Sequence, residues 1–127
     1  MAPDVMKVFL TGATGYVGSA VLDALVRGGL QVTALVRDPE KAEQVSRRGV
    51  CPVLGDLRSP ATYTSQAETC DGAIHAALDH SKHGEDIDRQ AIDALLPAVR
   101  RRTIGSADLA PRPAPFFVYT SAAWVLG

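Results

Sequence analysis

The fold of this chain is decided by the stretch Val8-Phe9-Leu10-Thr11-Gly12-Ala13-Thr14-Gly15-Tyr16-Val17-Gly18. A short apolar run ends in three glycines spaced three residues apart, and a segment with helical periodicity follows directly over residues 19–26. This order is typical of a strand, a tight turn and a helix N-terminus, which together bind the pyrophosphate of a dinucleotide. Glycine-rich turns also occur for purely local reasons, but the strand and helix around this one favour a dinucleotide site.

Each glycine of this stretch has a separate role in such a turn. Gly12 lets the chain turn sharply off the strand, and Gly15 leaves no side chain between the backbone N–H groups and the phosphates. Gly18 lets the helix pack closely on the strand. The free N–H groups of the first helical turn and the helix dipole then bind the anion.

Strand and helix signals alternate along the chain, which indicates a parallel sheet with helices on both faces. Pro97 should kink the last predicted helix or end it early. Residues 103–115 are polar and contain Gly and Pro, which predicts a long loop. We expect strands over residues 7–10, 31–36, 51–54, 73–77 and 116–120, and helices over 19–27, 39–48, from Pro60 with Ser59 as its cap, and over 85–102.

Right-handed crossovers then favour a doubly wound α/β fold, Rossmann-like and of three layers, with strand order 3-2-1-4-5 and truncated after strand 5. In such a sheet the ligand lies at the carboxyl ends of the strands, at the switch point between strands 1 and 4. The residues that end the five strands should therefore face the ligand.

Composition and charge exclude several classes of function. The chain has 127 residues, which suits one domain, and its net charge of −1 gives no electrostatic case for nucleic acid or an anionic membrane surface. No apolar run approaches the ~20 residues that span a bilayer, and no signal peptide precedes the first strand. Cys51 and Cys70 are too few for a disulfide framework, so we expect free thiols in a cytoplasmic protein.

Arg37 follows the second predicted strand and indicates which dinucleotide is bound. An NAD site usually has an acidic residue here, which binds the ribose 2′-OH, whereas the planar guanidinium of arginine suits a 2′-phosphate. The neighbouring Asp38 competes for this role but is better explained as the cap of a helix that begins at Pro39. We therefore favour NADP(H) over NAD(H); the alternative is that Arg37 is only a solvated charge at a strand end.

The histidines do not indicate a metal site. His75 lies in a predicted central strand, so a buried histidine with satisfied hydrogen bonds is favoured over a catalytic one. His80 and His83 flank Lys82 in a polar loop without an evident third ligand, so we expect no metal.

Four motifs follow one another in order, each at the end of an expected strand. They are the glycine-rich stretch over 11–18, Gly55-Asp56-Leu57, Ile74-His75-Ala76-Ala77 and Val118-Tyr119-Thr120-Ser121. Together they resemble the extended short-chain dehydrogenase/reductases, and in particular the branch of NAD(P)-dependent epimerases/dehydratases and dihydroflavonol-reductase-like proteins. The resemblance implies an NAD(P)-binding Rossmann-like domain over residues 1–127, with the substrate domain absent.

The resemblance also implies a role for each motif. Residues 14–17 would donate hydrogen bonds to the pyrophosphate, and Arg37 would contact the 2′-phosphate. Asp56 and Leu57 would lie against the adenine, whose amine would donate to the Asp56 carboxylate, and Ala76 and Ala77 would line the path toward the nicotinamide ribose. The expected cofactor-binding residues are Thr11, Gly12, Ala13, Thr14, Gly15, Tyr16, Val17, Gly18, Arg37, Asp56, Leu57, Ala76 and Ala77.

The sequence departs from the family pattern at the catalytic residues. Members that transfer hydride use a serine or threonine after the fifth strand and a downstream Tyr-x-x-x-Lys, whose tyrosine is the general acid/base. This chain has no Tyr-x-x-x-Lys, because alanine stands four residues after each of its tyrosines. Alanine also occupies the usual hydroxyl position, at Ala122. Thr120 and Ser121 are therefore the catalytic candidates, or else strand-end residues near the nicotinamide.

Two main functions are consistent with these residues. The first is an oxidoreductase or epimerase that transfers a hydride between NAD(P) and a small carbonyl, hydroxyl or sugar-nucleotide-like substrate. The alternative is a non-catalytic NADP(H)-binding or redox-sensing module, as in NmrA-like relatives, and a third, weaker one is a decayed fragment that binds nothing. The chain is either the N-terminal part of a longer reductase or a short protein, in which a homodimer would cover the apolar edge of the last strand.

Overall fold

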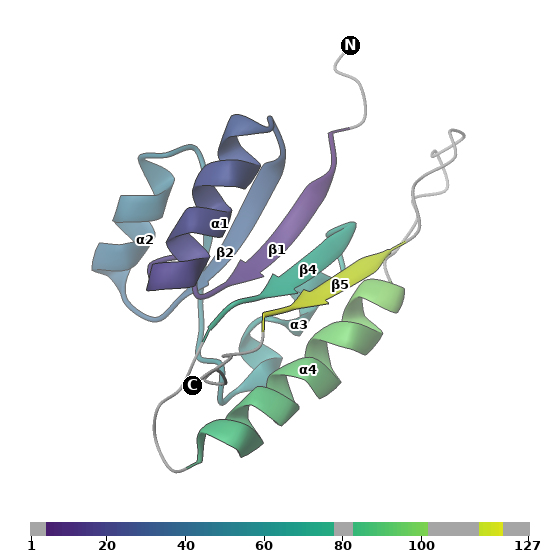
Figure 1. Ribbon diagram of the computed structural model, residues 1–127. Helices are drawn as coiled ribbons and strands as arrows, with labels where there is room; N and C mark the ends of the chain where they lie inside the picture. Colours follow the sequence, from purple (N-terminus) through teal and green to yellow (C-terminus); the bar gives the residue numbers. More distant parts are fainter. Residues whose placement is uncertain (1–4, 78–82, 102–114, 121–127) are drawn as a thin grey trace, which may run out of the picture.

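A five-stranded parallel sheet forms the centre of the computed structural model, which describes residues 5–77, 83–101 and 115–120. Its strand order is β3-β2-β1-β4-β5 (Figure 1). The doubly wound fold and the strand order predicted from the sequence are therefore confirmed. The strands are β1 (Lys7–Thr11), β2 (Gln31–Val36), β3 (Cys51–Leu54), β4 (Gly72–His75) and β5 (Phe116–Tyr119), and the helices are α1 (Tyr16–Arg27), α2 (Pro39–Ser46), the 3-10 helix η1 (Pro60–Thr62), α3 (Thr64–Ala67) and α4 (Gly84–Arg100).

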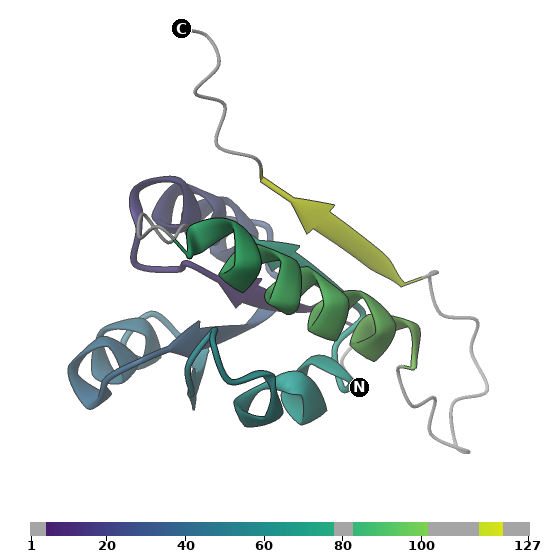
Figure 2. The same cartoon turned by 90° about the horizontal axis from the view of Figure 1, so that it is seen from below.

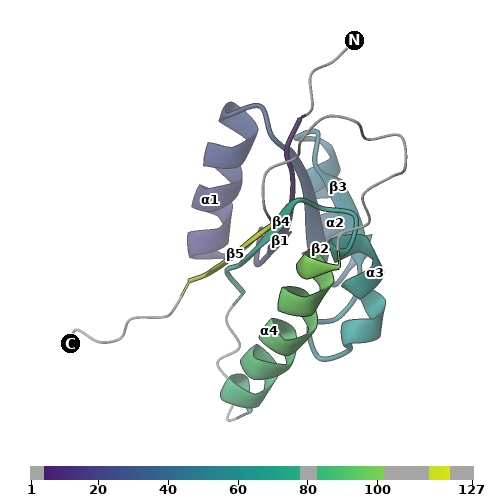
Figure 3. The same cartoon turned by 90° about the vertical axis from the view of Figure 1, so that its right-hand side faces the viewer.

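β1 is the central strand and divides the interior into two cores. Successive side chains of a strand point to opposite faces, so Phe9 and Leu10 belong to different cores. Phe9 packs with Tyr63 and with residues of α4, whereas Leu10 packs with residues of α1 and α2. Figure 3 shows α1 on one side of the strands and α3 and α4 on the other. A strand covered on both faces is apolar where it is covered, as β1 is from Val8 to Leu10.

α1 begins at Tyr16, three residues before its predicted start, because the glycine-rich turn leads into the helix without a linker. Gly12 has a φ of +77°, a conformation that favours glycine. A Cβ added to Gly18 would lie 1.6 Å from the Gly12 carbonyl oxygen. The first turn of α1 therefore packs directly on the backbone of the turn, which is the close approach that the sequence predicted for Gly18.

α4 continues through Pro97 and ends at Arg100, so the expectation that Pro97 would end it early is wrong. Pro97 lies in the last turn of the helix, where the missing N–H removes one hydrogen bond and little of the helix follows. The neighbouring Leu95, Ala98 and Val99 are fully or almost fully buried, and their packing holds this turn on the sheet. Figure 2 shows α4, in green, running beside β5, in yellow.

The segment after β3 also differs from its prediction. In place of one helix from Pro60, the chain forms η1 and then the single turn of α3. The Ser59 side chain makes no capping hydrogen bond; instead its carbonyl accepts from the Thr62 hydroxyl at 2.7 Å. The remaining elements agree with their predicted ranges to within two residues. Of the loop predicted over 103–115, only Pro115 is among the described residues.

None of the helices in the described ranges is both long enough and apolar enough to cross a bilayer.

The contact between Gly18 and the Gly12 carbonyl makes a stability prediction. Gly18→Ala forces the helix and the turn apart, and we expect it to lower the free energy of unfolding by about 3 kcal/mol. The matched control is Gly29→Ala, where an added Cβ meets no atom within 4 Å and only the φ of +79° is unfavourable, at a cost of about 1 kcal/mol. Urea unfolding of both variants measures the difference. If the two variants lost the same free energy of unfolding, the close contact between Gly18 and the Gly12 carbonyl would not contribute to stability.

Candidate functional site

A cavity of about 590 Å³ opens at the carboxyl edge of the sheet, where β1, β2 and β4 end. Every residue of the predicted cofactor-binding set lines it except Gly18, which lies beneath the turn. Four lining residues were not predicted from the sequence. The lining residues are Thr11, Gly12, Ala13, Thr14, Gly15, Tyr16, Val17, Leu35, Val36, Arg37, Lys41, Asp56, Leu57, Arg58, Ala76 and Ala77.

The N-terminus of α1 forms one wall of this cavity and has the properties of an anion site. Gly15 is the N-cap residue and supplies no capping side chain, and no acidic residue lies in the first turn. The N–H groups of Tyr16 and Val17 start the helix and so lack a carbonyl one turn earlier. The Gly15 N–H differs, because it donates to the Gly12 carbonyl at 3.0 Å. In this structure the Gly15 N–H closes the turn.

The end of β4 passes directly over Gly12. A Cβ on Gly12 would lie 2.6 Å from the Ala77 nitrogen and 2.7 Å from the Ala76 carbonyl carbon. Gly12 is thus constrained twice, by its positive φ and by this crossing. The sequence indicated the first constraint but gave no sign of the second.

Two cations stand at the end of β2. The Asp38 carboxylate accepts the Lys41 N–H at 2.8 Å and caps α2, as predicted. The carboxylate beside Arg37 is therefore committed to the helix. In the described part of the chain, neither the Arg37 nor the Lys41 side chain forms an ion pair. Lys41 was missed by the sequence analysis, although its place one turn into a capped helix could have indicated it.

The loop after β3 holds Asp56 in a fixed orientation. One Asp56 carboxylate oxygen accepts the Arg58 N–H at 2.9 Å, and the Asp56 N–H donates to the Thr62 hydroxyl at 3.0 Å. The buried Tyr63 donates its hydroxyl to the Leu57 carbonyl at 3.1 Å. Burial, and to a smaller extent the nearby Asp56 carboxylate, raises the pKa of Tyr63 to about 12. Tyr63 therefore anchors this loop to the core as a neutral phenol.

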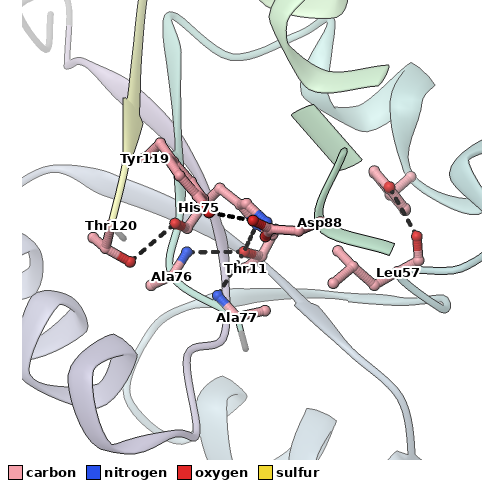
Figure 4. A network of polar contacts seen from close by, with 9 residues as sticks. Thr11, Leu57, His75, Ala76, Ala77, Asp88, Tyr119 and Thr120 are labelled. Carbon is pink, nitrogen blue, oxygen red and sulfur yellow. Dashed lines mark hydrogen bonds and ion pairs between the residues drawn. The ribbon is translucent and has the colours of Figure 1, made fainter. Parts of the chain in front are cut away.

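A network of polar contacts lies at the switch point between β1 and β4 (Figure 4). The Thr11 hydroxyl accepts the N–H groups of Ala76 and Ala77 at 3.0 and 3.2 Å. It lies 2.7 Å from Nδ1 of His75, whose Nε2 lies 2.6 Å from an Asp88 carboxylate oxygen. His75 is completely buried, so the prediction of a core histidine with satisfied hydrogen bonds is confirmed.

The end of β5 joins the same network. The Tyr119 hydroxyl donates to Asp88, which raises the pKa of Tyr119, and the Tyr119 ring stacks on His75 with ring centroids 5.7 Å apart. Thr120 donates both its N–H and its hydroxyl to the His75 carbonyl, each at 3.1 Å. Thr120 is not among the residues that line the cavity. Ser121 and His80 lie outside the described residues.

The raised pKa of Tyr63 predicts a loss of stability in alkali. An unfolded tyrosine keeps the usual pKa of 10.0, so the stabilisation from the neutral buried phenol is complete below pH 10 and is lost as the pH rises through about 12. We expect the free energy of unfolding of the parent chain to fall over this range, and Tyr63→Phe to remove that part of the fall. Urea unfolding at a series of pH values measures it, with Tyr16→Phe at an exposed tyrosine as the control. An unchanged pH dependence in Tyr63→Phe would refute the assignment.

Comparison with known proteins agrees with this geometry. A family model described as NAD(P)H-binding matches residues 12–120. The chain is 40% identical over 90 residues to 4-hydroxy-2-methyl-3-oxo-4-farnesyl-3,4-dihydroquinoline-1-oxide ketoreductase of Stigmatella aurantiaca, a match that covers 71% of this chain and 27% of the relative. It is 33% identical over 78 residues to a putative dihydroflavonol 4-reductase of Synechocystis, which covers 61% of this chain and 22% of the relative.

Solved structures have the same fold. An NADPH-dependent quinone oxidoreductase of Escherichia coli, complexed with NADPH, superposes with a TM-score of 0.67 at 23% identity over 90% of this chain and 36% of that one. A short-chain dehydrogenase/reductase superfamily protein of Agrobacterium tumefaciens, with bound NAD, superposes with a TM-score of 0.68 at 20% identity over 92% of this chain and 33% of that one.

The chain spans between 27% and 34% of the length of three curated relatives that it matches. The matched part is the one that carries the glycine-rich turn and the cavity. The resemblance to the short-chain dehydrogenase/reductases that the sequence motifs indicated is confirmed. Because the family match extends over residues 12–120, the chain belongs to the NAD(P)H-binding family.

Proposed function

We propose that this chain is the cofactor-binding domain of an oxidoreductase of the short-chain dehydrogenase/reductase type, and that it prefers NADP(H) to NAD(H). The preference for NADP(H) rests on the charged residues that follow β2. Asp38 uses its carboxylate to cap α2, while Arg37 and Lys41 line the cavity without ion-pair partners among the described residues. A 2′-phosphate between two such cations gains charge-assisted hydrogen bonds, whereas Asp38, the carboxylate next to Arg37 in sequence, does not line the cavity and offers nothing there to a 2′-hydroxyl.

The cavity suits a whole dinucleotide laid along the sheet edge. The pyrophosphate lies against the N-terminus of α1, where the N–H groups of Tyr16 and Val17 are free to donate. The space beside the Gly15 Cα is open to a phosphate. A Cβ added there would meet only one atom within 4 Å, the Gly12 carbonyl oxygen at 3.5 Å. The adenine lies beside Asp56 and Leu57, and the nicotinamide end lies toward Ala76 and Ala77. When bound, the nicotinamide supplies or accepts a hydride at its C4 carbon.

The charge of the cavity supports the same orientation. Arg37, Lys41 and Arg58 line the end next to β2 and β3, and Asp56 is the acidic residue among the lining residues. An excess of positive charge at this end favours the phosphorylated adenosine of NADP(H).

Loss of Arg37 tests the cofactor preference. We expect Arg37→Ala to weaken NADPH binding about tenfold or more, because charge-assisted hydrogen bonds to the 2′-phosphate are lost, and to leave NADH binding nearly unchanged. Isothermal titration calorimetry and thermal-shift titration with both nucleotides measure the two affinities.

The matched control is Arg47→Ala, at an exposed arginine just beyond α2 that pairs with Glu43 away from the cavity. It should bind both nucleotides like the parent chain. If NADH stabilises the parent chain as strongly as NADPH does, the proposed preference is wrong.

The substrate side of the proposal rests on the relatives. We propose a small carbonyl or hydroxyl compound, or a sugar-nucleotide-like one, as substrate. The two relatives named above are reductases, and the 127 residues correspond to less than a third of either. Thr120 and Ser121 remain the catalytic candidates of this proposal.

A non-catalytic NADP(H)-binding module is the second candidate. Two observations favour it: the Thr120 hydroxyl is committed to the His75 carbonyl, and the Tyr119 hydroxyl to Asp88 on α4. Neither hydroxyl is then free to orient a carbonyl or to donate a proton. A module of this kind binds NADPH without turning it over.

Turnover separates the two candidates. NADPH oxidation by the chain is followed at 340 nm with a panel of small ketones, aldehydes and quinones. Nucleotide binding with substrate-dependent oxidation supports an oxidoreductase, whereas binding without oxidation is expected of a sensing module. Absence of nucleotide binding contradicts both.

We also propose that the protein is cytoplasmic and that it forms a homodimer. Cys51 and Cys70 are free thiols, which suits the reducing cytoplasm. β5 is an edge strand with a half-exposed Val118, and pairing of this edge with a second copy of the chain would cover it.

A further inference from the structure

The polar network around His75 links α4 to the floor of the cavity through side chains from three strands. Thr11 ends β1, His75 ends β4 and Tyr119 ends β5, and Asp88 reaches them from α4 (Figure 4). Asp88 does not line the cavity, and its side chain is 22% exposed on the far side of His75. The network therefore connects a helix outside the candidate site to the backbone inside it.

The Thr11 hydroxyl accepts more backbone N–H groups than it has protons to donate. It accepts the Ala77 N–H, and it shares the Ala76 N–H with the Thr11 carbonyl, which lies 3.2 Å from the same nitrogen. These contacts direct the hydroxyl proton toward Nδ1 of His75, 2.7 Å away. On the other side of the ring, Nε2 of His75 lies 2.6 Å from an Asp88 carboxylate oxygen and donates to it.

Asp88 completes the chain as an acceptor. It accepts from Nε2 of His75 with one carboxylate oxygen and from the Tyr119 hydroxyl with the other. The charge of a carboxylate strengthens both bonds and holds the His75 proton on Nε2. Without it, Nε2 of His75 has no acceptor among the described contacts, and the ring that faces the Thr11 hydroxyl loses its bond to α4.

The last step leads into the cavity. The Thr11 hydroxyl fixes the backbone of Ala76 and Ala77, which crosses Gly12 so closely that no Cβ fits between them. This backbone forms the end of the cavity assigned above to the nicotinamide. The opposite end is formed by Arg37 and Asp56, which have no contact with the network.

We propose that Asp88 and His75 are positioning residues for the nicotinamide half of the cofactor: through Thr11 they hold Ala76 and Ala77 where the nicotinamide ribose binds. This inference rests on the proposed cofactor function. A purely structural role of the same contacts would change the stability of the sheet without distinguishing the two halves of the dinucleotide.

The test compares two ligands on the full chain. NADPH contacts both ends of the cavity, whereas 2′,5′-ADP carries only the adenine half. We expect Asp88→Ala to weaken NADPH binding about tenfold, because the bonds that position the nicotinamide end are lost, and to leave 2′,5′-ADP binding within about twofold of the parent. Isothermal titration calorimetry gives both affinities.

Two variants control the test. Asp88→Asn restores most of the NADPH affinity, since its carbonyl oxygen still accepts from His75 and its amide donates to the Tyr119 oxygen. Asp93→Ala, at an exposed acidic residue of the same helix, leaves both affinities unchanged. Urea unfolding of each variant shows that it is folded under the conditions of the titration.

The outcomes separate this inference from the proposed function. If Asp88→Ala binds both ligands like the parent, or loses both equally, the positioning role is wrong and the cofactor function stands. If the parent chain binds neither ligand, the cofactor function is wrong and the positioning role falls with it.

Discussion

The structure depends on how closely three elements approach the backbone at Gly12. α1 packs its Gly18 against the Gly12 carbonyl, β4 crosses over the Gly12 Cα, and β1 delivers the chain to that point. No side chain fits at Gly12 or at Gly18. This packing brings the first N–H groups of α1 to the edge of the sheet and places them beside the ends of β2 and β4. The cavity exists because the backbone, and not side chains, fills the centre of the site.

Two kinds of anchoring surround this centre. At the end that we propose for the adenine, single residues act on their own local backbone: Asp38 caps α2, and Asp56 holds the N–H of Arg58. At the other end, a chain of hydrogen bonds runs from α4 through His75 to Thr11 and reaches residues far apart in sequence. The first kind leaves Arg37 and Lys41 without ion-pair partners among the described residues, and the second joins side chains of three strands and α4 to one another. We therefore expect charge to govern binding at the adenine end and backbone position to govern it at the other.

Tyr63 and Tyr119 each belong to one of these two kinds of anchoring. Tyr63 is buried and holds the loop after β3 through the Leu57 carbonyl, and its raised pKa follows mainly from that burial. Tyr119 is partly exposed, and its hydroxyl bond to Asp88 is the main cause of its raised pKa. Both phenols are committed to holding backbone or carboxylate groups in place. The chemistry of proton transfer, where it occurs, then belongs to other groups.

The sequence by itself determined the strands, their order, the glycine-rich turn and the lining residues from the ends of β1, β2 and β4, because these follow from local patterns. Short apolar runs, helical periodicity, the glycine spacing and the capping aspartate before Pro39 are each read within a few residues, and the strand order follows from the right-handed crossovers between them. Only the tertiary structure decided that Pro97 would not end α4, that Thr120 would turn to the His75 carbonyl, and that Lys41 and Arg58 would join the cavity wall. It also joined Thr11 to His75 and Asp88 to Tyr119, across 64 and 31 residues of sequence. Such contacts depend on which strand ends meet and on buried polar atoms needing partners, and neither is written in any local stretch of the chain.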